Sequence, residues 1–176
     1  MSQPQFVLLL LAMFLAVAVY WDVRERRVPN KLVLFGLAIG FVFQVWFFGL
    51  QGAGMFLSGA LAGLAVLLPF NLLRLLGAGD VKLMAMVGGF IGSASAMLWV
   101  VLYTFVAGGL LVVVFATLGR AWGKLGSNLF IMWKLGFSEL DARGTGDQNK
   151  LQPAARLPYA VAIACGSLAY LLFGTP

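Results

Sequence analysis

The chain contains no histidine and a single cysteine, Cys165. One cysteine cannot form a disulfide framework within the chain or a cysteine-based zinc site. Without histidine, the commonest metal ligand and the usual general base are both missing. We therefore expect no metal and no cofactor, and any chemistry must use carboxylates, hydroxyls, Tyr, Lys or the backbone.

Charge is scarce as well: 10% of the 176 residues are charged, 62% are hydrophobic, and the mean hydropathy is +0.98. A soluble domain is typically about 25% charged and about 45–50% apolar, and a small fold cannot bury such an apolar excess. The sequence therefore predicts a membrane protein with the lipid bilayer as its surroundings. The net charge of +6 does not indicate a nucleic-acid partner, because the basic residues separate apolar runs and are not interleaved with aromatics.

The lengths of the charge-free stretches predict six membrane-spanning helices. A hydrocarbon core about 30 Å thick needs about 20 helical residues. Residues 32–73 and 83–119 contain no charged side chain, so each stretch can hold two spans, with breaks expected at the glycine- and serine-containing segments 51–54 and 92–95. We expect an all-α membrane protein, a single polytopic domain over residues 1–176. The predicted spans are 5–21, 32–50, 55–73, 81–92, 97–118 and 157–174.

The basic residues predict the orientation of these spans. All twelve Lys and Arg residues fall in the loops after the first, third and fifth spans. The positive-inside rule places those three loops in the cytoplasm and both termini outside. A cleaved signal peptide is the alternative reading of 5–21, but no Lys or Arg precedes that apolar run.

The segment 119–157, between the fifth and sixth spans, is the one sizeable extramembrane piece that the pattern predicts. Apolar residues recur there at helical spacing, which favours an amphipathic helix lying in the cytoplasmic interface. We interpret it as a connector anchored by its apolar face, with a surface that contacts substrate or lipid as the alternative. The apolar positions are Trp122, Leu125, Leu129, Met132 and Trp133.

Two of the six acidic residues lie at the ends of predicted spans. Asp22 follows the first span, and Asp80 stands at the start of the fourth. Acidic residues at membrane depth are functional by default, although each could instead simply end or cap a helix. Because two complete spans separate Asp22 from Asp80, the topology returns them to the same side of the membrane. Packing of the first and fourth spans would bring the two carboxyls together.

A carboxylate pair can catalyse hydrolysis. Two carboxylates about 4 Å apart repel by roughly 4 kcal/mol at an effective dielectric constant near 20, which corresponds to about three pKa units. One proton is then shared: the ionised carboxylate activates water as a general base, and the protonated one donates to the scissile carbonyl. Gly77 and Gly79 remove bulk beside Asp80 and let a helix or an extended substrate approach.

Two segments around these acids resemble the motifs of the prepilin peptidase family of membrane aspartic proteases. The first is Trp-Asp-Val-Arg-Glu-Arg-Arg-Val-Pro-Asn at 21–30, and the second is Gly-Ala-Gly-Asp-Val-Lys-Leu at 77–83. The Arg-Leu-Pro-Tyr-Ala segment at 156–160 extends the resemblance to the last predicted span. The resemblance implies that Asp22 and Asp80 are the catalytic pair.

The motifs also contain supporting residues that have structural readings of their own. These are Gly77, Gly79, Lys82, Pro29 and Asn30. Pro29 stops a helix, and Asn30 is expected to be the N-cap of the second span. Lys82 either stabilises an ionised Asp80 or extends toward the interface.

The resemblance further implies an enzyme of the bacterial cytoplasmic (inner) membrane whose active site faces the cytoplasm. Such enzymes remove the leader peptide from type IV prepilins or pseudopilins during pilus assembly. Larger members carry paired cysteines that bind zinc, which this chain lacks, so it looks like the short form associated with tight-adherence (Flp-type) pili. No residue pattern establishes N-methylation or an oligomeric state.

Three other functions are compatible with parts of this pattern. A small proton-coupled transporter would place acids near the middle of its spans, whereas both acids here are at one face. A non-enzymatic pilus-assembly subunit would be favoured by loss of either acid, and both are present. A different intramembrane aspartic protease is expected to carry its acids deeper in adjacent spans.

Overall fold

The computed structural model describes residues 3–25, 27–73, 76–118 and 159–174. The chain divides into two compact units. The larger unit contains Met1–Gly108 and Pro158–Pro176, and the smaller contains Gly109–Leu157. The predicted connector at 119–157 lies outside the described residues, so the smaller unit is represented by the end of one helix.

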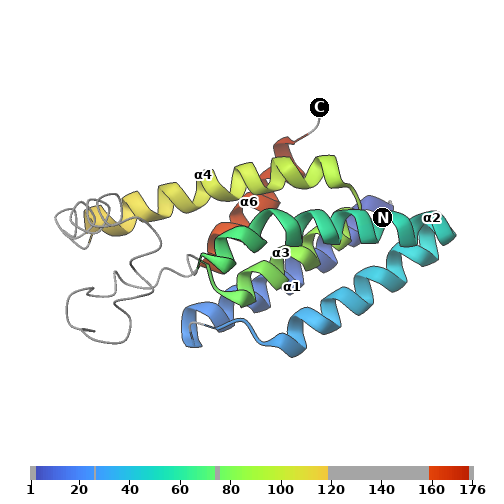
Figure 1. Ribbon diagram of the computed structural model, residues 1–176, viewed down its shortest axis with the longest axis horizontal. Coiled ribbons are helices and arrows are strands. Elements are labelled where there is room, and N and C mark those ends of the chain that lie inside the picture. Colours follow the sequence, from blue (N-terminus) through green and yellow to red (C-terminus); the bar gives the residue numbers. More distant parts are fainter. Residues whose placement is uncertain (1–2, 26, 74–75, 119–158, 175–176) are drawn as a thin grey trace. The chain divides into compact units, whose positions relative to one another are not determined.

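The described elements are all helices (Figure 1). An all-α fold is therefore confirmed. The bounds are α1 Gln3–Glu25, α2 Asn30–Leu72, α3 Ala78–Ile91, α4 Ala94–Leu118 and α6 Tyr159–Phe173. The predicted break at 92–95 lies where α3 ends: Gly92 terminates it in a left-handed conformation with φ 69°, and α4 begins two residues later.

α2 doubles back on itself, so its two halves form a helical hairpin (Figure 1). The break is at Gly49, whose φ of 60° and ψ of −142° are tolerated by glycine but by few other residues. The turn predicted at 51–54 is therefore wrong in position, because those residues are helical. Gly52 serves close packing instead: a Cβ there would collide with the carbonyl oxygen of Gln44.

α3 is the central helix of the larger unit. All residues from Leu83 to Phe90 are buried, and α3 packs against α2, α1 and α6. Glycines allow the closest approach: Gly59 of α2 faces Gly88 of α3, and a Cβ on either would collide with the carbonyl oxygen of the other. Gly59 and Gly63 have the small-xxx-small spacing that brings membrane helices into close contact.

Among the described residues, α2 and the Ala94–Phe115 part of α4 are long and apolar enough to cross a membrane. The exterior is correspondingly apolar: Trp46, Leu50 and Leu34 are 83%, 91% and 70% exposed. Such large exposed apolar side chains belong in lipid. The six-span arrangement remains a prediction, because α3 and α6 have 14 and 15 residues.

Candidate active site

Asp22 is a buried carboxylate in the last turns of α1, 7% exposed. Its Oδ2 accepts a hydrogen bond of 3.0 Å from the backbone N–H of Ala160. Ala160 is in the first turn of α6, where backbone N–H groups have no partner within their own helix. The Asp22 carboxyl therefore supplies an acceptor to one of the free backbone donors at the start of α6.

Asp80 lies in the first turn of α3, three residues after Gly77, which is the N-cap. Its backbone N–H donates to the Gly77 carbonyl at 3.1 Å, and its carboxylate accepts a hydrogen bond from the backbone N–H of Gly77. This is the return half of a capping box. The alternative reading of Asp80 as a helix-capping residue is thus correct in part, since it stabilises the start of α3.

The charge of Asp22 acts on the Asp80 carboxyl. Asp80 precedes the span predicted at 81–92. Burial, and then the negative charge of Asp22, raise the pKa of its carboxyl to about 6. The hydrogen bond from Gly77 has the opposite, smaller effect on this pKa. Asp22 and Asp80 lie on different helices, far apart in the sequence, so this influence arises from packing of α1 and α3. The larger unit therefore brings together the two acids that the sequence singled out.

A second contact joins the two motif segments. The Nζ of Lys82, two residues after Asp80, donates to the Oδ1 of Asn30 at 3.1 Å. Gly79 lies beside Val28, where a Cβ would be 3.5 Å from the valine Cβ. Loop 27–29 is thus held against the start of α3, and we call the Lys82–Asn30 hydrogen bond the motif bridge.

The remaining motif residues have structural roles at helix ends. Pro29, not Asn30, is the N-cap of α2, and its carbonyl accepts from the N–H of Leu32 at 3.1 Å. The prediction of Asn30 as N-cap is wrong, because its side chain is engaged in the motif bridge. Gly77 leaves room for the Asp80 carboxylate: a Cβ on Gly77 would be 3.1 Å from Oδ2.

The sequence pattern does not indicate that α6 belongs to the site. Besides the Ala160 N–H, α6 brings the phenol of Tyr159 near Asp80. The part of the sequence that could have indicated this role of α6 is the Pro-Tyr-Ala segment at 158–160. Its pattern predicts only the start of the last membrane span. A backbone donor has no side-chain signature, so its partner could not be identified from the sequence.

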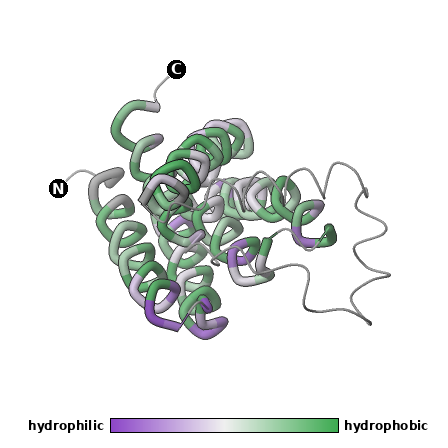
Figure 2. The backbone as a smooth tube through the Cα atoms, turned by 90° about the vertical axis from the view of Figure 1, so that its left-hand side faces the viewer, coloured by the Kyte–Doolittle hydropathy of each residue, from purple (hydrophilic) through white to green (hydrophobic). Residues whose placement is uncertain are grey.

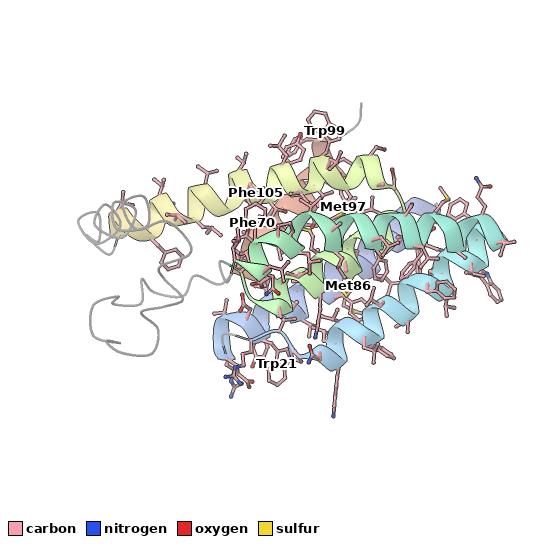
Figure 3. All side chains as sticks on the ribbon, in the orientation of Figure 1. Trp21, Phe70, Met86, Met97, Trp99 and Phe105 are labelled. Atoms are coloured by element: carbon pink, nitrogen blue, oxygen red, sulfur yellow. The ribbon has the colours of Figure 1, made fainter. Side chains whose placement is uncertain are left out.

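The polar character of this end of the larger unit is visible in Figure 2, where the hydrophilic colour gathers where α1 ends and α2 begins. Figure 3 shows Trp21, the neighbour of Asp22, at the same end. In the described part of the chain, no three His, Cys, Asp or Glu residues form a group that could hold a metal ion.

Comparison with known proteins identifies the family. A sequence model of the type IV leader peptidase family matches residues 9–113, which include both acids and both motif segments. No curated protein matches the chain. No solved structure matches it either. The matched region covers more than half of the sequence, and with its apolar helices this makes the chain a membrane protein of the type IV leader peptidase family: a prepilin leader peptidase of the aspartic endopeptidase class.

Proposed function

We propose that Asp22 and Asp80 are the catalytic pair of this peptidase. The observation that carries the assignment is that packing of α1 and α3 places Asp22 close enough to Asp80 for its charge to raise the pKa of the Asp80 carboxyl. Both acids also accept hydrogen bonds from backbone N–H groups, Asp80 from Gly77 and Asp22 from Ala160. Such preorganisation is what a hydrolytic dyad needs, because misplacement by about 1 Å is costly for catalysis.

The surroundings favour distinct roles for the two acids. Asp22, at the positive end of α6, is assigned as the base that takes a proton from water while the water oxygen attacks the scissile carbonyl. Asp80, whose pKa is raised, is assigned as the acid that protonates the carbonyl oxygen. The tetrahedral intermediate then breaks at the C–N bond: the proton held by Asp22 passes to the leaving amine, and the hydroxyl formed on the former carbonyl oxygen returns its proton to Asp80 as the C=O bond re-forms.

The finer features of the substrate and the membrane orientation belong to the same proposal. Family membership implies prepilin leader peptides as substrates. We assign the Flp-type subclass because the chain resembles the short form without paired cysteines. We assign six spans, both termini outside and cleavage at the cytoplasmic face of the bacterial inner membrane, because the basic residues occupy alternate loops.

The test is cleavage of a co-expressed Flp-like prepilin by variants with one carboxyl replaced. Asp22→Asn and Asp80→Asn keep the size and an accepting oxygen of each side chain but remove the acid–base function. We expect each variant to lose leader cleavage, scored as a mobility shift of the prepilin, while its amount in the membrane fraction is unchanged. Removing a member of a catalytic unit typically costs orders of magnitude in rate.

The matched control is Glu25→Gln. Glu25 is exposed and lies one turn beyond Asp22 in the same helix, so this variant removes an acidic charge from α1 without touching the buried pair. It should process the prepilin normally. Continued cleavage by a membrane-inserted Asp22→Asn or Asp80→Asn protein would disprove the dyad.

A further inference from the structure

The peptide unit between Leu76 and Gly77 connects Asp80 to a residue of α2 that lies outside the motif segments. Its carbonyl, that of Leu76, accepts a hydrogen bond of 2.9 Å from the side-chain amide nitrogen of Asn71. Its N–H, that of Gly77, donates to the Asp80 carboxylate. Both groups belong to one planar peptide, so the Asn71 amide and the Asp80 carboxylate are hydrogen-bonded to the same rigid unit. We call these two hydrogen bonds the Asn71 relay.

The contact between Asn71 and Leu76 joins two ordered segments, the last turn of α2 and the residues before α3. A carbonyl oxygen can only accept, so the amide has to present its N–H side to Leu76. Both residues are half-buried, and the side chain of Leu76 packs against the apolar core of the larger unit. Phe70, the residue before Asn71, is labelled in Figure 3.

Other hydrogen bonds hold the backbone around this contact. The N–H of Leu76 donates to the carbonyl of Phe70 at 3.3 Å. The N–H of Leu73, the C-cap of α2, donates to the carbonyl of Pro69 at 3.0 Å. These are backbone bonds, which do not depend on the side chain at position 71. The Asn71 amide therefore acts on the orientation of the 76–77 peptide and is not needed to end α2.

We propose that Asn71 is a positioning residue for Asp80: by holding the Leu76 carbonyl, its amide aims the Gly77 N–H at the Asp80 carboxylate. Hydrogen bonds in series polarise one another, so donation to the carbonyl of a peptide makes its N–H a stronger donor. That N–H stabilises the ionised form of the carboxyl it binds. The effect on catalysis rests on the proposed role of Asp80 as the acid, whereas the relay itself does not.

The direction of the effect follows from the form of Asp80 that the relay stabilises. The Gly77 hydrogen bond lowers the pKa of Asp80, against burial and the charge of Asp22, which raise it to about 6. Without the Asn71 amide this lowering weakens, so the pKa of Asp80 rises further. Asp80 then keeps its proton to a higher pH.

A substitution at position 71 leaves the titratable groups around Asp80 in place. α3 packs against α1, α2 and α6. The groups that these helices and α3 itself contribute are Asp22 of α1, Tyr159 of α6, Lys82 of α3, which is bound to Asn30, and Lys31 at the exposed start of α2.

Asn71→Leu tests the relay, because leucine keeps the approximate size of the side chain and removes the donor. Full-length protein in nanodiscs, labelled with ¹³C at the aspartate carboxyls, would be titrated by NMR, and the Asp80 signal assigned by its loss in Asp80→Asn. We expect the pKa of Asp80 to rise by about half a unit. This is the shift that results when a charge-assisted hydrogen bond loses about 30% of its strength. Asn71→Ala removes the same donor and should give the same shift.

The pH profile of prepilin cleavage separates positioning from a merely structural role. The alkaline limb of kcat/KM, where the acid loses its proton, should move up by the same half unit in Asn71→Leu. A structural defect would lower kcat/KM at every pH and leave the limb in place, which would contradict the proposal. Asn71→Gln restores an amide donor and should return the limb toward its position in the parent protein.

Ser58→Ala is the matched control within α2. It removes a hydrogen bond of 2.9 Å from the Ser58 hydroxyl to the Met55 carbonyl, about 20 Å along the helix from Asn71. It should leave both the Asp80 titration and the pH profile unchanged. An unshifted Asp80 titration in Asn71→Leu, or an equal shift in Ser58→Ala, would overturn the relay. A shifted titration with an unmoved alkaline limb would uphold the relay and reject Asp80 as the acid.

Discussion

A hydrogen bond joins the side chains of Lys82 and Asn30, one from each motif segment. We expect this bond to affect catalysis. The motif bridge joins the start of α2 to the first turns of α3, which hold Asp80. We expect Asn30→Ala and Lys82→Met each to lower kcat/KM for prepilin cleavage about fivefold, because a hydrogen bond worth about 1 kcal/mol no longer fixes the start of α3, with Asp80, relative to the start of α2. Steady-state kinetics on purified protein would measure this.

The double variant distinguishes a bridge from two independent contributions. If Asn30 and Lys82 act through one bond, the double variant should be no worse than either single variant. Lys31→Met is the control: it removes an exposed positive charge next to Asn30 but leaves the bridge intact, and its kcat/KM should stay close to that of the parent. Additive losses in the double variant would contradict a bridge.

Asp22 and Asp80 could be selected from the sequence because charge in an apolar chain is rare and because an even number of spans returns the chain to the same side. Their hydrogen-bond partners could not be selected in this way. The donors are backbone N–H groups of Ala160 and Gly77, which every residue but proline possesses. The partners of Gln44 could not be selected for a related reason: its side-chain amide donates to backbone carbonyl oxygens of α3, which the sequence does not place beside it.

The α2–α3 interface depends on the absence of side chains where the two backbones come closest. Gly88→Val would place a branched side chain against the carbonyl of Gly59, so α2 and α3 would have to separate. Overpacking of this kind typically costs about 1–3 kcal/mol. We expect a lower midpoint of thermal unfolding in detergent, followed by circular dichroism, and reduced cleavage because α3 carries Asp80.

Gly54→Ala is the matched control for that variant. Gly54 is exposed and helical, and a Cβ added there would meet no atom within 4 Å. Alanine at such a site should leave stability unchanged or raise it by up to about 1 kcal/mol. Equal destabilisation by Gly88→Val and Gly54→Ala would mean that the close α2–α3 contact is not what glycine provides at position 88.

The helix bounds were largely predictable, because apolar length and interrupting charges define them, but the reversal within α2 was not. Glycines at 49, 52 and 54 all permit a turn. The choice is made by packing: Gly52 is needed where its turn of helix meets the Gln44 carbonyl, which leaves Gly49 to adopt the positive φ. Local sequence shows where a turn is allowed, and tertiary contacts decide which allowed position is used.

The proposed orientation in the membrane places both acids on the side where prepilin leaders would be cut. It can be tested by labelling single cysteines introduced into a variant that has no other thiol. Cys165 is exposed and is the single cysteine, so Cys165→Ser gives a background without thiols. Arg27→Cys and Leu73→Cys probe the loops flanking the acids, and Ser95→Cys probes the α3–α4 connection; all three positions are exposed.

A membrane-impermeant maleimide applied to spheroplasts should label Ser95→Cys at once, and should label Arg27→Cys and Leu73→Cys after the membrane is opened. The expectation follows from the basic residues in the loops around 27 and 74, which the positive-inside rule retains in the cytoplasm. Labelling of positions 27 and 73 from opposite sides would separate the two acids across the bilayer and exclude a shared site. Labelling of both from outside would keep the pair but reverse the face at which it acts, and prepilin leaders held in the cytoplasm could not then reach it.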